Sequence, residues 1–127
     1  MRALGDMQES SATIEALVAR EIERISQPDL VALAQALRVP PRLEERPWNY
    51  GREGQTYPCW ITFIHPPSNT VIAYCSKGFG PRDPWGLLFL TEPRHMGMDS
   101  QWFTSVEDAL RDSRAWKGKN PPGYEIP

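Results

Sequence analysis

The first pattern of apolar positions along the chain is helical. Apolar residues that recur three or four positions apart fall on one face of a helix over residues 11–26. Ser11 can accept a hydrogen bond from one of the first free backbone N–H groups and so begin this helix. The residues of its expected buried face are Ile14, Leu17, Val18, Ile22 and Ile25.

A second amphipathic stretch follows almost at once. Ser26 followed by Pro28 is typical of a helix start, and Pro40 stops the helix that we expect over residues 28–39. Two short helices joined so closely usually cover a sheet, and a partner-binding coiled coil is the alternative. The inner face of this second helix comprises Leu30, Leu33, Ala34 and Leu37.

After the second helix the apolar positions lose their helical period, and the segments that follow have the composition of β-strands. Residues 40–56 mix proline, glycine and charge, which predicts an irregular connector. Residues 57–66 and 69–77 are rich in β-branched and aromatic side chains and flank a Pro-Pro-Ser turn, which predicts a hairpin. Residues 84–91 form a third expected strand, and residues 95–103 are a candidate for a short fourth.

The last periodic segment is again helical. Thr104 followed by Glu107 is a capping box, which predicts a helix over residues 104–116. The chain therefore reads as α+β: an antiparallel sheet of three to four strands with two N-terminal helices and one C-terminal helix. Its 127 residues are a typical size for one domain, and we expect a single domain over residues 1–127.

The expected hairpin has a register that brings two cysteines together. With the turn at residues 66–68, side chains opposite one another share one face of the sheet, and the apolar ones indicate a core face. Reduced cysteines packed in the core are the preferred interpretation, and a disulfide between them is the alternative. The expected pairs are His65 with Asn69, Phe63 with Val71, Ile61 with Ala73, and Cys59 with Cys75.

No motif in the sequence predicts catalytic or metal-binding residues. His65 lies six residues from Cys59, roughly 20 Å along a strand, which is too far to activate that thiol. The chain has neither the CxxC nor the HxxxH spacing typical of zinc sites, and His95 is a lone loop histidine. We therefore expect no enzyme, no metal and no cofactor.

Charge and hydropathy narrow the classes of partner. The formal net charge is −2 and Lys and Arg form no stripe, which argues against nucleic acid binding. No apolar run approaches the length of a membrane span, so no membrane partner is expected. The start of the chain does not resemble a secretory signal, and we expect a cytoplasmic protein.

The most distinctive segment is the loop GFGPRDPWG over residues 78–86. Glycine and proline together favour a rigid loop that can present side chains to a partner. Aromatic and arginine residues are enriched at protein interfaces, although the charged pair in this loop could instead serve local turns. The candidate protein-binding residues are Phe79, Arg82, Asp83 and Trp85, together with Tyr50.

Several segments carry a resemblance to small uncharacterised bacterial proteins. They are YPCWITFIH, SNTVIAYCSKGFGPRDPWGLLFL, MGMDSQWF and the SVEDALRDSRAW helix, and the resemblance covers roughly Trp48 to Trp116. Such compact proteins are similar to the immunity proteins of bacterial polymorphic or secreted toxin systems. The resemblance implies a non-enzymatic protein that binds and neutralises a cognate toxin, and it transfers no site residues.

A function of a different class remains as the alternative. The chain could be a small enzyme or ligand-binding domain with an aromatic-lined pocket. Its pocket would be lined by tryptophan together with Tyr57, Arg82 and His95.

Overall fold

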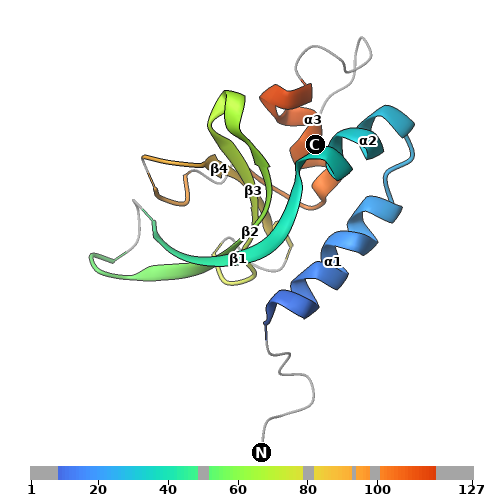
Figure 1. Ribbon diagram of the computed structural model, residues 1–127. Coiled ribbons are helices and arrows are strands. Elements are labelled where there is room, and N and C mark those ends of the chain that lie inside the picture. Colours follow the sequence, from blue (N-terminus) through green and yellow to red (C-terminus); the bar gives the residue numbers. More distant parts are fainter. Residues whose placement is uncertain (1–8, 49–51, 79–81, 93, 98–100, 117–127) are drawn as a thin grey trace, which may run out of the picture.

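The chain folds into a curled antiparallel sheet with helices packed on one side, as the computed structural model in Figure 1 shows. The structure describes residues 9–48, 52–78, 82–92, 94–97 and 101–116. Within these residues the α+β class is confirmed, with three α-helices and a five-stranded sheet. The elements are α1 (Ser11–Glu23), α2 (Pro28–Leu37), β1 (Arg38–Pro47), β2 (Thr56–His65), β3 (Thr70–Tyr74), β4 (Trp85–Phe89), β5 (Trp102–Phe103) and α3 (Val106–Asp112).

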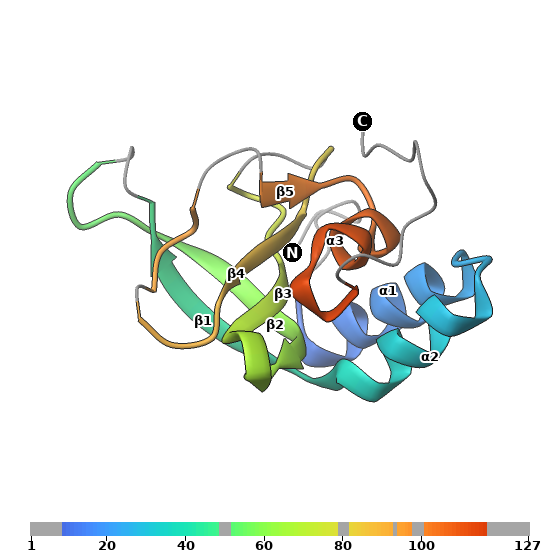
Figure 2. The same cartoon turned by 90° about the horizontal axis from the view of Figure 1, so that it is seen from above.

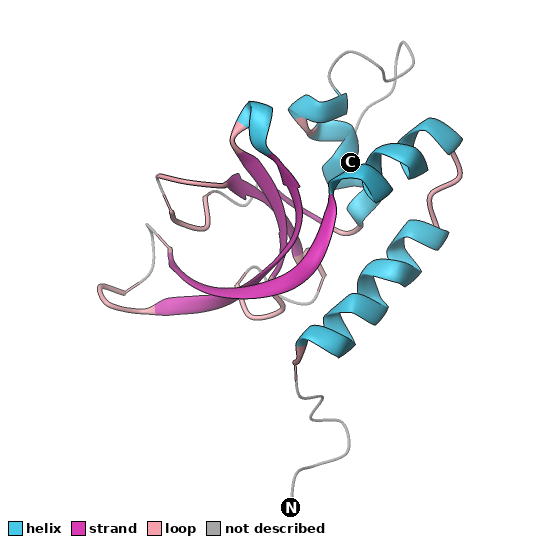
Figure 3. Ribbon diagram, in the orientation of Figure 1, coloured by secondary structure: helices cyan, strands magenta, loops and turns pink. Residues whose placement is uncertain are grey.

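The strands form a simple meander in the order β1-β2-β3-β4-β5, and every neighbouring pair is antiparallel. Seen from above in Figure 2, the sheet lies on one side and the helices on the other, with α3 next to β5. Figure 3 shows the same two layers by colour, with the helices outside the curve of the sheet. None of the helices in the described part of the chain combines the length and apolar character needed to cross a bilayer.

The strand β1 corrects the expected connector over residues 40–56. Arg38 already has extended backbone, so α2 ends at Leu37, and β1 pairs with β2 along the edge of the sheet, with an irregularity between Arg38 and Arg42. Proline is tolerated on an edge strand because the outer N–H groups of that strand have no ladder partner to lose. The prolines of this segment argued against a strand, so the sequence pattern predicted a connector there.

The other boundaries differ from the expected ones by a few residues. Ser10, not Ser11, caps α1, and it forms a capping box with Thr13. Ser105, not Thr104, caps α3, because its side chain accepts the hydrogen bond from the N–H of Asp108. The expected helix over 104–116 ends at Asp112 and continues as the 3-10 turn Arg114–Trp116, and the candidate strand over 95–103 shortens to β5.

A β-bulge in β2 corrects the expected face of Phe63. Ile61 pairs with Ala73 as expected, but Phe63 pairs with Ile72, so Thr62 is the extra residue of β2. Its hydroxyl, which is fully buried, donates a 2.7 Å hydrogen bond to the carbonyl of Ile72. An extra residue reverses the alternation of side chains, so Phe63 faces the helices while Ile61 faces the opposite side.

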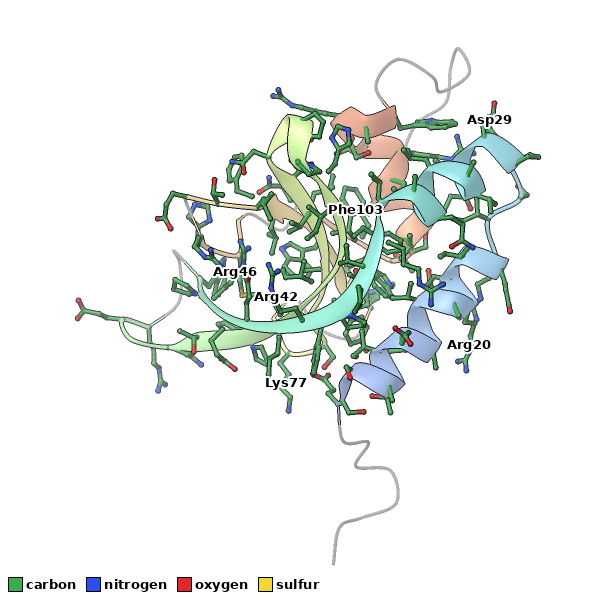
Figure 4. The ribbon with its side chains drawn as sticks, in the orientation of Figure 1. Arg20, Asp29, Arg42, Arg46, Lys77 and Phe103 are labelled. Atoms are coloured by element: carbon green, nitrogen blue, oxygen red, sulfur yellow. The ribbon has the colours of Figure 1, made fainter. Side chains whose placement is uncertain are left out.

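The sheet separates two apolar cores, one on each of its faces. The helix-side core joins the inner faces of the three helices to the sheet, and Figure 4 shows Phe103 between them. The far-side core fills the curve of the sheet, where Gly86 leaves room for the ring of Trp102. The sheet contributes Trp60, Phe63, Ile72, Trp85 and Phe103 to the helix-side core. The buried residues of the far-side core are Cys59, Ile61, Val71, Ala73, Cys75, Leu88, Met96 and Trp102.

Candidate functional site

The loop expected to bind a protein connects β3 to β4, whose first residue is Trp85, whereas position 50 lies between β1 and β2. Phe79 and Tyr50 fall outside the described residues. Arg82 is exposed, whereas Asp83 is half-buried and accepts a 3.0 Å hydrogen bond from the hydroxyl of Thr104. Trp85 is only 2% exposed, so it supports the loop from the core and does not belong to the surface.

Both ends of this loop are fixed to the sheet. The N–H of Cys75 donates a 2.8 Å hydrogen bond to the carbonyl of Pro84, which closes the base of the loop. The ring of Trp85 meets Tyr74 edge-on, with centroids 5.0 Å apart. Lys77 and Arg82 are exposed beyond this base, and Figure 4 shows Lys77 at the end of the sheet near the start of α1. We call these two cations, with Asp83, the loop surface.

The residues of the alternative pocket do not line the large groove seen in the described part of the fold. That groove has a volume of about 220 Å³ and lies between the sheet and the end of α3. Neither Tyr57, Arg82 nor His95 lines it. His95 is half-buried and its Nδ1 accepts a 3.0 Å hydrogen bond from the N–H of Gly97. The lining residues are Thr70, Leu87, Leu88, Phe89, Gln101, Asp112, Ser113 and Arg114.

A cluster of charged residues on β1 was not anticipated from the sequence. Glu44 accepts hydrogen bonds from Arg42 Nη2 at 2.9 Å and from Arg46 Nε at 3.0 Å. Arg94, from the segment that follows β4, lies 2.8 Å from the same carboxylate. Figure 4 shows Arg42 and Arg46 on the inner side of the curved β1 strand. We call these four residues the Glu44 cluster.

The cluster contains more positive than negative charge, and one of its cations is buried. The side chain of Arg46 is 1% exposed, against 55% for Arg42 and 46% for Arg94. Its Nη2 lies 2.9 Å from Glu44, but its buried Nη1 has no hydrogen-bond acceptor among the residues that the structure describes. Burial alone would raise the pKa of Glu44, yet the hydrogen bond from Arg42 and the charges of Arg46 and Arg94 outweigh it and lower that pKa.

A period of two could have identified this cluster. Arg42, Glu44 and Arg46 alternate with outward residues, as side chains on one face of a strand do. The prolines of the segment argued against a strand, and Arg94 is too distant in sequence for any local pattern to include it. The charge cluster therefore follows from the missed strand.

The two cysteines are neighbours in the far-side core, as the sequence predicts. Trp60 pairs with Tyr74, and one further step of that register places Cys59 opposite Cys75. Both thiols are free and buried, and they interact directly with each other. His65 lies at the other end of β2, where its Nδ1 contacts the hydroxyl of Ser68 at 2.7 Å.

The part of the chain that the structure describes has no group of three metal-ligating side chains. Comparison of the sequence and the structure with protein-family models, curated proteins and solved structures gives no match. Three features of the fold are therefore candidates for a functional site: the loop surface, the groove beside α3, and the far-side core with its cysteines and buried arginine.

Proposed function

We propose that this chain is a non-enzymatic binding protein, an immunity protein that neutralises a cognate bacterial toxin in the cytoplasm. The supporting observation is the fixed base of the loop between β3 and β4. The hydrogen bond from Cys75 to Pro84 and the buried ring of Trp85 hold this base in place. A fixed base reduces the entropy that the loop loses on binding, which favours tight association.

The charges of the loop surface indicate the charge that its partner carries. Lys77 and Arg82 are exposed, while the carboxylate of Asp83 is engaged by Thr104. The surface therefore presents positive charge, and its partner carries an acidic patch.

Charge reversal tests this proposal. Co-expression with any neighbouring gene product that proves toxic to cells, followed by affinity purification, should recover a stoichiometric complex. Arg82→Glu should weaken that complex at least about tenfold, because it places like charges face to face across the interface. Arg20→Glu makes the same change on the exposed side of α1, which Figure 4 shows well away from Lys77, and should leave affinity unchanged.

The result of this experiment distinguishes the proposed immunity function from the proposed position of the interface. Failure to recover a partner, together with no protection of cells from the neighbouring toxin, contradicts the immunity function. A complex that tolerates Arg82→Glu as well as it tolerates Arg20→Glu keeps the function but moves the interface away from the loop surface.

The groove beside α3 supports a second candidate function, a small enzyme or ligand-binding domain. Its walls combine the apolar side chains of Leu87 and Phe89 with polar groups, including Asp112. Burial raises the pKa of Asp112, as expected for a carboxyl group at the side of a partly enclosed groove. A metabolite that raises the thermal midpoint of the wild type but not of Leu87→Trp, which fills the groove, would favour this function.

A further inference from the structure

The Glu44 cluster holds more positive charge than its carboxylate can neutralise. An oxygen of Glu44 lies 2.8–2.9 Å from a nitrogen of each of three guanidinium groups, those of Arg42, Arg46 and Arg94. Within the described part of the chain, Glu44 is the one carboxylate that pairs with them. Two positive charges are therefore left over, which favours an anion beside the cluster.

The most buried of the three cations also lacks an acceptor. Arg46 approaches Oε1 of Glu44 with Nε and Nη2, while its Nη1 is buried and has no acceptor among the described residues. The side chain is 1% exposed, so water screens its charge much less than at the surface. This charge therefore adds to the positive potential at the exposed side of the cluster.

The other two cations form an exposed rim that a ligand can reach. The side chain of Arg42 is 55% exposed and that of Arg94 is 46% exposed. Their Nη2 atoms lie 2.9 and 2.8 Å from the same oxygen of Glu44, Oε2, so one small anion can contact both groups. A guanidinium group carries five N–H donors in a flat fork that matches an oxyanion, and Glu44 engages Nη2 of each. Further donors remain for a ligand.

The protein holds both parts of this rim in place without a ligand. Figure 4 shows Arg42 on the inner side of the curved β1 strand. Arg94 precedes Met96, whose N–H donates a 3.0 Å hydrogen bond to the carbonyl of Pro47 and whose side chain is buried in the far-side core. The carbonyl of Met96 accepts a 2.9 Å hydrogen bond from the indole N–H of Trp102. Cations positioned in advance bind an anion at a smaller cost in entropy.

We propose that the Glu44 cluster is a binding site for a small dianionic oxyanion, inorganic phosphate or the phosphate group of a small metabolite, held between Arg42 and Arg94. A dianion neutralises both excess charges, whereas a monocarboxylate neutralises one. The oxygens of a tetrahedral ligand point in several directions, so a single ligand can accept from both guanidinium groups. The site makes no use of the loop surface and stands independently of the proposed toxin binding.

Calorimetric titration of the folded full-length protein with inorganic phosphate tests this site. The titrations are run at constant ionic strength, because salt screens exposed charges. Wild type should bind one phosphate saturably, and Arg42→Gln and Arg94→Gln should each weaken binding at least about tenfold, since each removes charge-assisted hydrogen bonds. Arg20→Gln removes the same charge from the exposed side of α1 and should leave the affinity unchanged.

Three further ligands define what the site recognises. Sulfate, another tetrahedral dianion, should compete with phosphate, whereas acetate should bind at least about tenfold more weakly because it carries one charge. Glycerol 3-phosphate distinguishes the two sources of the phosphate group. Binding tighter than that of phosphate assigns the site to a monoester, and weaker or equal binding assigns it to the free ion. Acetate that binds as tightly as phosphate would overturn the preference for a dianion.

The thermal midpoint of unfolding gives an independent measurement. A ligand that binds the folded state raises this midpoint, so phosphate should raise it above the value in chloride of equal ionic strength, in wild type and in Arg20→Gln. The double variant Arg42→Gln/Arg94→Gln, which changes two exposed side chains, should show no such increase. No saturable binding in wild type, or equal affinity in the double variant and in Arg20→Gln, would overturn the proposal.

Discussion

At the scale of single residues, the fold places one guanidinium group almost entirely out of water, which is costly. Arg46 has 1% of its side chain exposed, and Glu44 is its one ion-pair partner among the described residues. Desolvation of a charge is tolerated only when an opposite charge and hydrogen bonds replace water. The stability of β1 therefore depends on one carboxylate.

We expect Glu44→Gln to destabilise the protein by about 2 kcal/mol at neutral pH, because it leaves Arg46 buried without a counter-charge. The folded pKa of Glu44 is lowered, so its contribution is fully present above the ordinary carboxyl pKa of 4.5 and is lost as pH falls through the lower folded value. Urea titrations of wild type and variant should therefore differ most near neutrality and converge in acid.

The neighbouring carboxylate provides the control for this effect. Glu45 is exposed on the other face of β1 and accepts a hydrogen bond from Thr56. Glu45→Gln should change the free energy of unfolding by no more than about 0.5 kcal/mol. A Glu44→Gln deficit that stays constant from neutral pH to the acid limit of folding would show that ionisation of Glu44 is not its source.

The sequence predicted residue contacts correctly where a short turn and the alternation of side chains along neighbouring strands determine them. The proximity of Cys59 and Cys75 followed from a short turn and a period of two, and the structure confirms it. The ion pair between Arg94 and Glu44 joins positions that no local pattern connects. The burial of Trp85 depends on the packing of the helices against the sheet, which the sequence of its loop does not encode.

At the scale of elements, the bulge at Thr62 decides which side chains reach which core. The extra residue turns Phe63 toward the helices, and a hydroxyl bound to the carbonyl of Ile72 holds it in place. The sequence around it, with apolar residues at every position from 59 to 64 except one threonine, fits both faces equally well. The expected register was therefore right up to Ile61 and wrong beyond it.

We expect Thr62→Val to cost about 1–2 kcal/mol, because an isosteric change removes the donor and leaves a buried carbonyl with a poorer set of partners. Urea denaturation measures this loss. Thr56→Val changes the same residue type at the exposed start of β2 and should stay within about 0.5 kcal/mol of wild type. Equal stability of Thr62→Val and wild type would mean that the bulge does not need its hydroxyl.

Element boundaries show where local signals compete. Adjacent serines and threonines at the starts of α1 and α3 offered more than one cap, and at α1 the local capping box with Thr13 selects Ser10. At α3 the carboxylate of Glu21, from α1, accepts a 3.0 Å hydrogen bond from the N–H of Val106 and so fixes the first turn. Such long-range caps satisfy free N–H groups in a way that sequence spacing does not reveal.

At the scale of the whole molecule, one sheet serves two cores. The strands β2, β3 and β4 contribute alternate side chains to the helix side and to the far side, so neither core can loosen without disturbing the other. We expect the two cores to unfold together in a single cooperative transition.

Fluorotryptophan labelling tests this cooperativity, because 19F NMR resolves individual tryptophans. Trp85 reports on the helix-side core and Trp102 on the far-side core. Their resonances should change with the same midpoint in urea. An earlier midpoint for Trp102 would instead show that the far side opens as a separate unit.

The prolines of β1 have a consequence for how this protein behaves among its own copies. An edge strand offers its unpaired backbone groups as a template on which the strand of another molecule can add, the first step toward fibrous aggregates. β1 is one of the two edge strands of the sheet, and wherever a proline nitrogen of β1 faces outward the edge has no N–H to donate to an incoming strand. The residues that concealed this strand in the sequence thus protect the folded chain against self-association.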